Sequence, residues 1–140
     1  LIKVYSDAAT KGFYYYPRLD WSGLEKISEN IKVWVPFYDG FVFNNLFNHG
    51  VSIVPKFGSR KPVFCLEDHG LPFDDLVETG IKEYTEQNGY STLKTHQVYF
   101  YKSSDYLNYL TFRCINNRST LSKPNLDWMS SKLFSYESIR

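Results

Sequence analysis

The sequence predicts an α/β fold, arranged as a single compact domain in which a mixed sheet is flanked by about four helices. Segments with the two-residue period of strands, or with short apolar runs, alternate along the chain with segments of helical spacing. No internal repeat, low-complexity segment or linker divides the 140 residues. Hydrophobic residues make up 43% of the chain and charged residues 22%, enough to build a core under a solvated surface.

A hairpin and a short helix are the first elements predicted. Residues 1–5 alternate between apolar and polar side chains, which is typical of a strand, and the aromatic run 13–16 can pair with it across a turn. Ser22 and Glu25 have the spacing of a capping box, in which each side chain accepts a backbone N–H of the other residue. We therefore expect a helix over residues 22–30.

Three strands and one helix are predicted in the middle of the chain. Residues 32–37 form a strand that Pro36 ends or confines to a sheet edge, because proline has no N–H to donate. Apolar residues at helical spacing predict a helix over 42–47. The runs 51–54 and 63–66 predict two further strands, and the second of them is apolar throughout.

The longest predicted element is a helix over residues 72–87. Apolar side chains fall on one of its faces, and aspartates in its first turn suit the positive end of the helix dipole. The alternating run 95–101 predicts a strand, and 106–115 is also predicted as a strand because Tyr, Thr, Phe and Cys dominate it. A closing helix is predicted from apolar residues at helical spacing, namely Leu126, Met129 and Leu133.

Charge and hydropathy disfavour several classes of function. The formal net charge of +1, with no run of like charges, disfavours a protein whose main ligand is duplex DNA. No apolar window approaches the length of a membrane span, so we expect a soluble, cytoplasmic protein without a membrane partner. The motifs GxxxxGK, GxGxxG, GxSxG and HExxH are missing, which disfavours nucleotide hydrolysis, Rossmann cofactors, lipase chemistry and zinc proteolysis. The oligomeric state stays open.

Two features of composition suggest an origin. The first residue is Leu1 rather than Met, which leads us to expect a domain excised from a larger protein. Ala8 and Ala9 are the only alanines, whereas the chain contains 12 Tyr and 11 Phe. Such a composition is typical of AT-rich genomes, so we expect a viral or low-GC microbial source.

Aromatic side chains interleaved with basic ones are the best candidates for a ligand-binding surface. The two clusters are Tyr14, Tyr16 and Arg18, and Tyr99, Tyr101 and Lys102. On a strand, half of each cluster must face away from the core, and exposed aromatics beside Lys or Arg stack on nucleobases or anchor a protein partner. The alternative is a sheet covered on both faces, in which the aromatics only fill space.

Asp7 follows the first predicted strand and precedes two small residues. This arrangement resembles the opening strand of ribonuclease H-like folds, and the resemblance implies that Asp7 binds a divalent metal ion. Such a site needs further carboxylates, for which Glu25 and Asp68 are the candidates. The alternative is a turn aspartate that accepts hydrogen bonds from its own backbone.

Asp68 and His69 precede Asn88 and His96, in an order that resembles the HNH nucleases. The resemblance implies that His69 activates water while flanking residues hold a metal ion. The chain departs from that family because Asn88 falls at a helix end, His96 falls in a predicted strand, and the zinc-binding cysteine pairs are missing. The alternative is a solvated loop histidine that precedes a helix.

Neither cysteine predicts a zinc site or a cofactor. Cys65 and Cys114 lie in apolar runs, and no CxxC motif occurs. The order of Cys65, His96 and Asn108 resembles that of papain-like proteases, but those enzymes place the thiol at a helix N-terminus, where its pKa is lowered. We interpret both cysteines as small buried hydrophobic residues. Whether they pair with each other stays open.

The sequence favours a recognition module of a larger protein that binds a protein partner or single-stranded nucleic acid, such as RNA, through aromatic-rich strands. The alternative is a divalent-metal-dependent nuclease, ribonuclease H-like or HNH-like, with Asp7, Asp68 and His69 as catalytic residues. The two hypotheses require different geometry. A nuclease needs at least two carboxylates that converge on one ion, whereas a recognition module needs solvent-exposed tyrosines.

Overall fold

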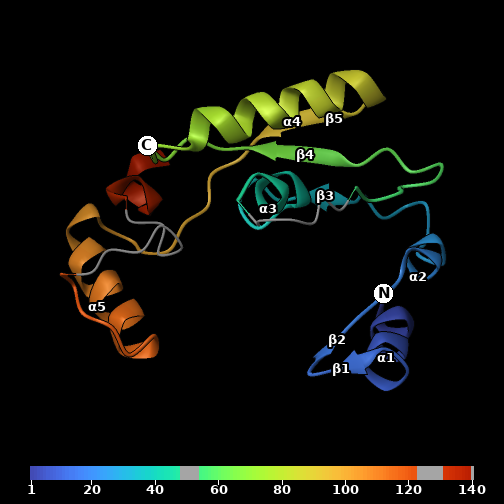
Figure 1. The fold of residues 1–140 in the computed structure, drawn as a ribbon, viewed down its shortest axis with the longest axis horizontal. Helices are drawn as coiled ribbons and strands as arrows, with labels where there is room; N and C mark the ends of the chain where they lie inside the picture. The colour runs from blue at the N-terminus through green and yellow to red at the C-terminus, as the bar shows by residue number, and fades with distance from the viewer. Residues whose placement is uncertain (48–53, 123–130, 140) are drawn as a thin grey trace.

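The computed structural model describes residues 1–47, 54–122 and 131–139. At its centre lies a three-stranded sheet in the order β3-β4-β5, formed by β3 (Trp34–Val35), β4 (Val63–Leu66) and β5 (Ser91–Lys94) (Figure 1). Both strand pairs in this sheet are parallel. The α/β class is therefore confirmed, whereas the prediction of a mixed sheet is wrong, since the antiparallel strands of the chain form a separate hairpin.

β4 occupies the centre of the sheet because its apolar run suits burial on both faces. Phe64, Cys65 and Leu66 are all buried. Val63 lies opposite Trp34 on one side and opposite Ser91 on the other. The predicted strand 63–66 is thus confirmed, and it sets the register of both neighbours.

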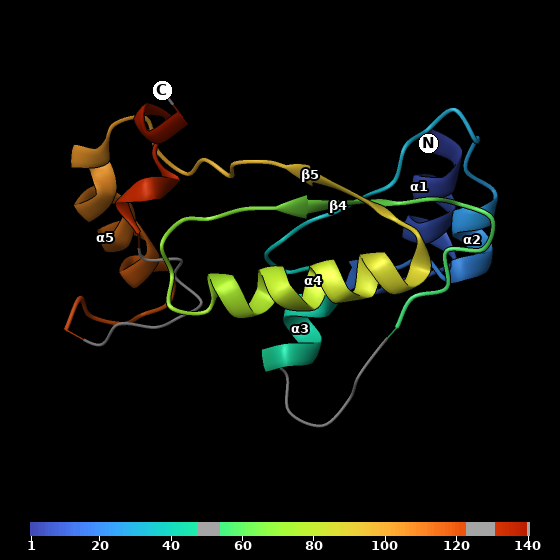
Figure 2. The ribbon, with the colours of Figure 1, turned by 90° about the horizontal axis from the view of Figure 1, so that it is seen from above.

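The crossover between β4 and β5 is α4 (Asp74–Asn88), a helix of 15 residues that runs along these two strands (Figure 2). It buries Val77 and Ile81 against the sheet and ends at Gly89, whose φ of 66° is the left-handed conformation that glycine adopts without strain. A second helix, α3 (Phe41–Phe47), packs on α4. In the described ranges, no helix is both long and apolar enough to cross a membrane.

The core between these elements is largely aromatic. Its most buried large side chains include Phe37, Tyr38, Phe64, Phe73 and Phe134. Several rings meet edge to face, as do Phe37 and Tyr38 with a centroid distance of 4.8 Å. Part of the aromatic content therefore fills space in the interior.

The N-terminal part differs from the predicted hairpin of strands 1–5 and 13–16. Residues 1–5 belong to a helix, α1 (Ile2–Thr10), so the strand prediction there is wrong. The hairpin forms instead within the aromatic run, between β1 (Phe13–Tyr14) and β2 (Tyr16–Pro17). This part lies at one end of the long axis of the molecule (Figure 1).

The short helix α2 (Trp21–Glu25) begins where the sequence predicts a helix, but its cap is different. The carboxylate of Asp20 accepts hydrogen bonds from the Gly23 N–H and the Ser22 hydroxyl, both at 2.8 Å. The predicted capping box is therefore wrong, because Ser22 donates to Asp20 and is itself inside the helix. The helix also stops well short of residue 30.

The C-terminal part contains a helix where a strand is predicted. Residues 106–115 lie in α5 (Tyr106–Asn116), which follows the 3₁₀ turn η1 (Ser103–Asp105). Its buried and half-buried side chains recur at helical spacing, at Tyr106, Tyr109, Leu110, Arg113 and Cys114. Packing along this stripe overrides the β propensity of the residue types.

The prediction of a strand over 95–101 is wrong in position, because the third strand of the sheet comes before it, at Ser91–Lys94. Within 95–101, only an isolated parallel bridge between Phe100 and Ser135 is formed. That bridge joins the segment to two 3₁₀ turns, η3 (Lys132–Phe134) and η4 (Tyr136–Ile139). The strand predicted over 51–54 and the helix predicted around Leu126 and Met129 fall outside the described residues, apart from Val54 and Leu133 at their margins.

Candidate functional site

The β1–β2 hairpin presents aromatic side chains on two faces. Tyr14 lies opposite Tyr16, and Phe13 lies opposite Pro17. Because directly opposed residues of an antiparallel pair share a face, Tyr14 and Tyr16 point to one side and Phe13 and Pro17 to the other. Tyr15 forms the turn with a φ of 60°. Alternate residues of the run therefore make different surfaces.

Arg18 belongs to the same face as the two paired tyrosines. Its N–H donates to the Gly12 carbonyl at 3.1 Å, which continues the pairing of the hairpin by one step. A Cβ on Gly12 would lie only 2.2 Å from the Arg18 carbonyl oxygen, so glycine is required at this close approach. The Arg18 guanidinium carbon lies 4.9 Å from the ring centroid of Tyr14, which is a cation–π contact. We call Tyr14, Tyr16 and Arg18 the hairpin face.

Solvent reaches most of the hairpin face. Tyr14 is 62% exposed and Tyr16 is 74% exposed. Because the two exposed tyrosines share one face, they form a contiguous aromatic patch, which indicates an interaction surface more strongly than single exposed side chains do. A two-stranded hairpin of this length has little stability of its own, and contacts with α1 support it.

The second aromatic cluster is used differently. Tyr99 stacks between Tyr109 and Phe134, with centroid distances of 5.2 and 4.9 Å, and burial raises its pKa to about 12. Tyr101 stacks on Tyr136 at 5.6 Å and remains 58% exposed. Tyr99 therefore supports the packing of the C-terminal part, and Tyr101 and Tyr136 form a stacked pair that is more exposed.

The two clusters do not form one surface. Lys102 is exposed and directly precedes η1 and α5 in the chain, and α5 lies at the opposite end of the long axis from α1 (Figures 1 and 2). The backbone N–H of Lys102 donates to the carboxylate of Asp105 at 3.1 Å, which starts η1. Of the residues that the sequence selects for binding, Tyr14, Tyr16 and Arg18 are brought together, whereas Tyr99, Tyr101 and Lys102 lie apart from them.

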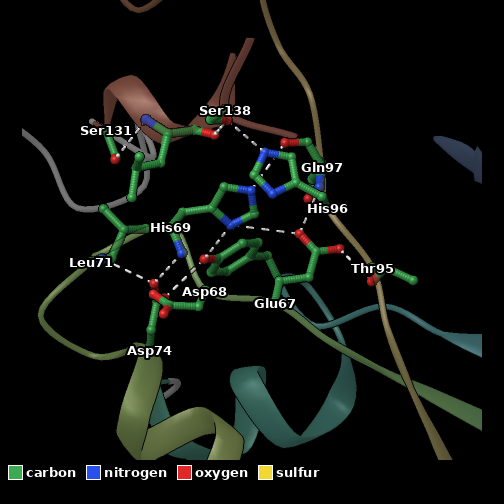
Figure 3. Close-up of polar contacts among 12 residues, drawn as sticks. Glu67, Asp68, His69, Leu71, Asp74, Thr95, His96, Gln97, Ser131 and Ser138 are labelled. Carbon is green, nitrogen blue, oxygen red and sulfur yellow. Dashed lines mark hydrogen bonds and ion pairs between the residues drawn. The ribbon is translucent and has the colours of Figure 1, made fainter. Parts of the chain in front are cut away.

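His69 lies at the centre of a buried polar network (Figure 3). The Tyr38 hydroxyl donates to Asp74 Oδ1 at 2.9 Å and lies 3.0 Å from His69 Nδ1. Asp74 Oδ2 accepts the backbone N–H groups of His69 and Leu71, both at 2.9 Å. Asp74 thereby organises the turn that leads from β4 into α4.

The protonation of His69 follows from its partners. Its Nε2 lies 3.1 Å from the carbonyl oxygen of Gln97, which can only accept, so Nε2 carries the proton and Nδ1 is an acceptor in the neutral ring. Burial lowers the pKa of His69, the neighbouring His96 lowers it further, and the carboxylate of Glu67 acts in the opposite direction. The single proton of the Tyr38 hydroxyl consequently faces two acceptors, His69 Nδ1 and Asp74 Oδ1.

Further bonds tie this network to the chain beyond β5. Glu67 accepts from the Thr95 hydroxyl and from the Gln97 N–H, both at 2.9 Å. The ring of His96 lies 3.0 Å from the Ser138 hydroxyl, which donates to the backbone carbonyls of Leu133 and Ser135 (Figure 3). Since its proton goes to those carbonyls, Ser138 is a structural cap rather than an activated nucleophile.

The buried network is inaccessible to a substrate. The His69 side chain is fully buried, and its ring stacks on Phe134 at a centroid distance of 3.8 Å. Tyr38 and Asp74 are also buried. The prediction of a solvated loop histidine is therefore wrong, and the HNH-like role of His69 in activating water requires an access that this packing does not provide.

The other residues of the nuclease hypothesis are dispersed. Asp7 lies in α1 rather than after a strand, and its carboxylate pairs with Lys11 at 3.2 Å. Asp68 is exposed and accepts the Gly70 N–H at 3.0 Å, as a turn residue does. Asn88 donates to the Tyr84 carbonyl at the far end of α4. Within residues 1–47, 54–122 and 131–139, no three His, Cys, Asp or Glu side chains are grouped to hold a metal ion.

Both cysteines are free and buried, as a small hydrophobic side chain would be. Cys65 lies in β4 and Cys114 in α5. Asn108 also lies in α5, whereas a papain-like thiol would require Cys65 at a helix N-terminus. The burial expected for the two thiols is confirmed.

Sequence reasoning missed Tyr38, Asp74 and Phe134, which complete the surroundings of His69. Asp74 carries only the general signal of an aspartate in the first turn of a helix, where negative charge suits the dipole. Tyr38 and Phe134 carry none, because they reach His69 from distant parts of the chain. Comparison of the chain with models of known families, with curated proteins and with solved structures finds no match.

Proposed function

We propose that this domain is a recognition module that binds single-stranded nucleic acid through the hairpin face. The observation that carries the proposal is the alignment of two exposed tyrosines and an arginine on one side of a hairpin. A compositional argument adds that the parent protein is viral or from a low-GC microbe and acts in the cytoplasm. The proposed source rests on scarce alanine beside abundant tyrosine and phenylalanine, and the proposed location rests on the lack of an apolar window as long as a membrane span.

Each part of the hairpin face matches a part of a single strand. Tyrosine rings stack on bases of any sequence, with about 1–3 kcal/mol per base. The Arg18 guanidinium lies beside Tyr14 and supplies a planar cation for the phosphate that follows a stacked base. Residues 12–19 contain no carboxylate that would repel the backbone. The modest net charge of +1 predicts weak binding that depends on salt.

A protein partner is the rival occupant of the hairpin face. Stable protein interfaces bury about 800 Å² on each partner, with an apolar centre formed by many residues. The hairpin face consists of three side chains on a two-residue strand pair. That area suits a few stacked nucleotides better than a folded partner.

The divalent-metal nuclease has less support from the described residues. Its proposed ligands Asp7 and Asp68 already accept other partners, and His69 is buried. The nuclease would also leave the exposed tyrosines of the hairpin without a use. We therefore keep recognition as the proposed function.

The test is an anisotropy titration of a fluorescently labelled oligouridylate of about ten nucleotides. The double variant Tyr14→Ala, Tyr16→Ala should weaken binding by about tenfold or more, because two stacking contacts are removed. Phe13→Ala is the matched control, since Phe13 is 60% exposed on the opposite face of the same hairpin. It should leave the dissociation constant within about twofold.

Two results would contradict the proposal. If the double variant and Phe13→Ala weaken oligonucleotide binding equally, the hairpin face is not the binding surface. Such a result is expected of non-specific binding or of loss of the hairpin. Absence of any salt-sensitive binding by the unmodified protein would favour a protein partner. Far-ultraviolet circular dichroism of each variant confirms that the fold is retained.

A further inference from the structure

A cavity of about 470 Å³ lies beside the hairpin face, between α1 and the chain that leads into α2. Its size is within the range of small-molecule sites, which is about 300–1,000 Å³. The apolar part of its wall is formed by Val4, Ala8 and Leu19. Its polar part includes three cationic residues, Lys11, Arg18 and Lys26.

Two carboxylates, those of Asp7 and Asp20, stand against these three cations. Asp7 pairs with Lys11 at 3.2 Å. Asp20 is held by the Ser22 hydroxyl and the Gly23 N–H, and these hydrogen bonds, helped by the charge of Lys26, lower its pKa. Throughout the part of the chain that the structure describes, neither Arg18 nor Lys26 forms an ion pair. The cavity lining therefore carries one net positive charge, and Arg18 and Lys26 are the two cations that a bound anion can reach without breaking an ion pair.

Arg18 connects the cavity with the hairpin face. Its guanidinium lies over the Tyr14 ring, and the same residue lines the cavity. A strand whose bases stack on Tyr14 and Tyr16 can therefore pass its end into the cavity without a gap in the contact surface. The apolar wall suits a sugar or base, while the cations suit a phosphate.

We propose that the cavity binds a terminal phosphate monoester of a single-stranded nucleic acid, with Arg18 and Lys26 as the anion-binding residues. This inference rests on the proposed function, because the hairpin face holds the strand that delivers the phosphate. A terminal monoester carries more negative charge than an internal diester, since its second pKa is about 6. Two cations in a partly enclosed site therefore bind the terminal monoester more tightly than an internal phosphate, because their charge-assisted hydrogen bonds are stronger to the more highly charged group.

The experiment compares three oligouridylates of about ten nucleotides, carrying a 5′-phosphate, a 3′-phosphate or hydroxyls at both ends. The unmodified protein should bind one phosphorylated form about tenfold more tightly than the hydroxyl form. Lys26→Ala should abolish most of this preference and leave binding of the hydroxyl form unchanged. Lys3→Ala is the matched control, since Lys3 is an exposed lysine of α1 that does not line the cavity.

The variants separate this inference from the proposed function. Tyr14→Ala with Tyr16→Ala should weaken binding of all three probes and preserve their ratio. Equal binding of the three probes by the unmodified protein would overturn the phosphate site and leave the hairpin face intact. An equal loss of preference in Lys3→Ala would also overturn it, because general charge would then explain the effect.

A free nucleotide shares the chemistry of a strand end, so uridine 5′-monophosphate is tested separately by thermal shift. One outcome is that the nucleotide stabilises the unmodified protein but not Lys26→Ala, while no oligonucleotide binds. That result would support the phosphate site and refute binding of a strand to the hairpin face. Failure of the nucleotide and of all oligonucleotides would refute both.

Discussion

Replacing Tyr38 with Phe should destabilise the protein by about 2–4 kcal/mol, although only one oxygen atom is removed. The hydroxyl donates to Asp74 Oδ1 at 2.9 Å and lies 3.0 Å from His69 Nδ1, and Tyr38 is only 2% exposed. Its loss removes the donor of Asp74 Oδ1, and an unsatisfied buried acceptor costs about 1–3 kcal/mol, or more when it is charged as this carboxylate is. The ring itself is retained, so packing against Phe37 changes little.

Urea unfolding followed by circular dichroism measures the change in the free energy of unfolding. Tyr101→Phe is the control, because Tyr101 is 58% exposed and a change at such a surface position stays within about 0.5 kcal/mol. A loss for Tyr38→Phe as small as that of the control would refute the reasoning. It would mean that His69 and Asp74 do not depend on this hydroxyl.

Two further predictions concern His69 and the end of α4. Burial lowers the pKa of His69, so the unfolded chain binds the proton more readily, and stability should fall as the pH decreases below about 6.5. His69→Gln should reduce this loss between about pH 7.5 and pH 5.5 in urea titrations, and an unchanged pH dependence would contradict the assignment. Gly89→Ala should cost about 1 kcal/mol, because the φ of 66° strains alanine while its Cβ would meet no atom within 4 Å. Gly89→Asn should recover part of the lost melting temperature, and equal losses for both variants would contradict a purely conformational cause.

The sequence could predict the elements whose signals are long or unambiguous. The apolar stripe of α4 indicates only a helix, and the fully apolar run of β4 indicates only a buried strand. Both elements are found at the predicted positions. The same holds for α3, where apolar residues repeat at helical spacing over Phe41–Phe47. These elements form the centre of the fold, which explains why the α/β class could be recognised.

The errors fall where a short pattern fits both helix and strand. Residues 1–5 alternate, but the helix that contains them continues through Ala8 and Ala9, which are strong helix formers. In α5, exposed Phe112 and Ile115 obscure the stripe that ends at buried Cys114. Only tertiary packing distinguishes the two readings in such segments.

The sequence could predict those parts of the candidate site whose residues are close together in the chain. Tyr14, Tyr16 and Arg18 are two residues apart in the chain, so any hairpin in this register brings them to one face. The cavity beside them exists because α1 lies against the chain that follows the hairpin. The sequence could not predict this cavity, because the pattern of residues 1–5 indicates a strand. The surroundings of His69 depend on contacts between distant segments and were likewise beyond local patterns.

The stacking of Phe134 on His69 has a consequence for the order of folding. We expect the sheet, α3 and α4 to form first, from contacts among residues 34–94, and His69 to be covered only when the segment that carries η3 packs on it. Closing so long a loop is slow compared with forming a helix, because its entropic cost precedes any gain from contact. We therefore expect the core around the sheet to form before Phe134 covers His69. Local opening in the native state should begin where Phe134 covers His69, at the hydrogen bond of 2.9 Å that the Tyr99 N–H donates to the Phe134 carbonyl.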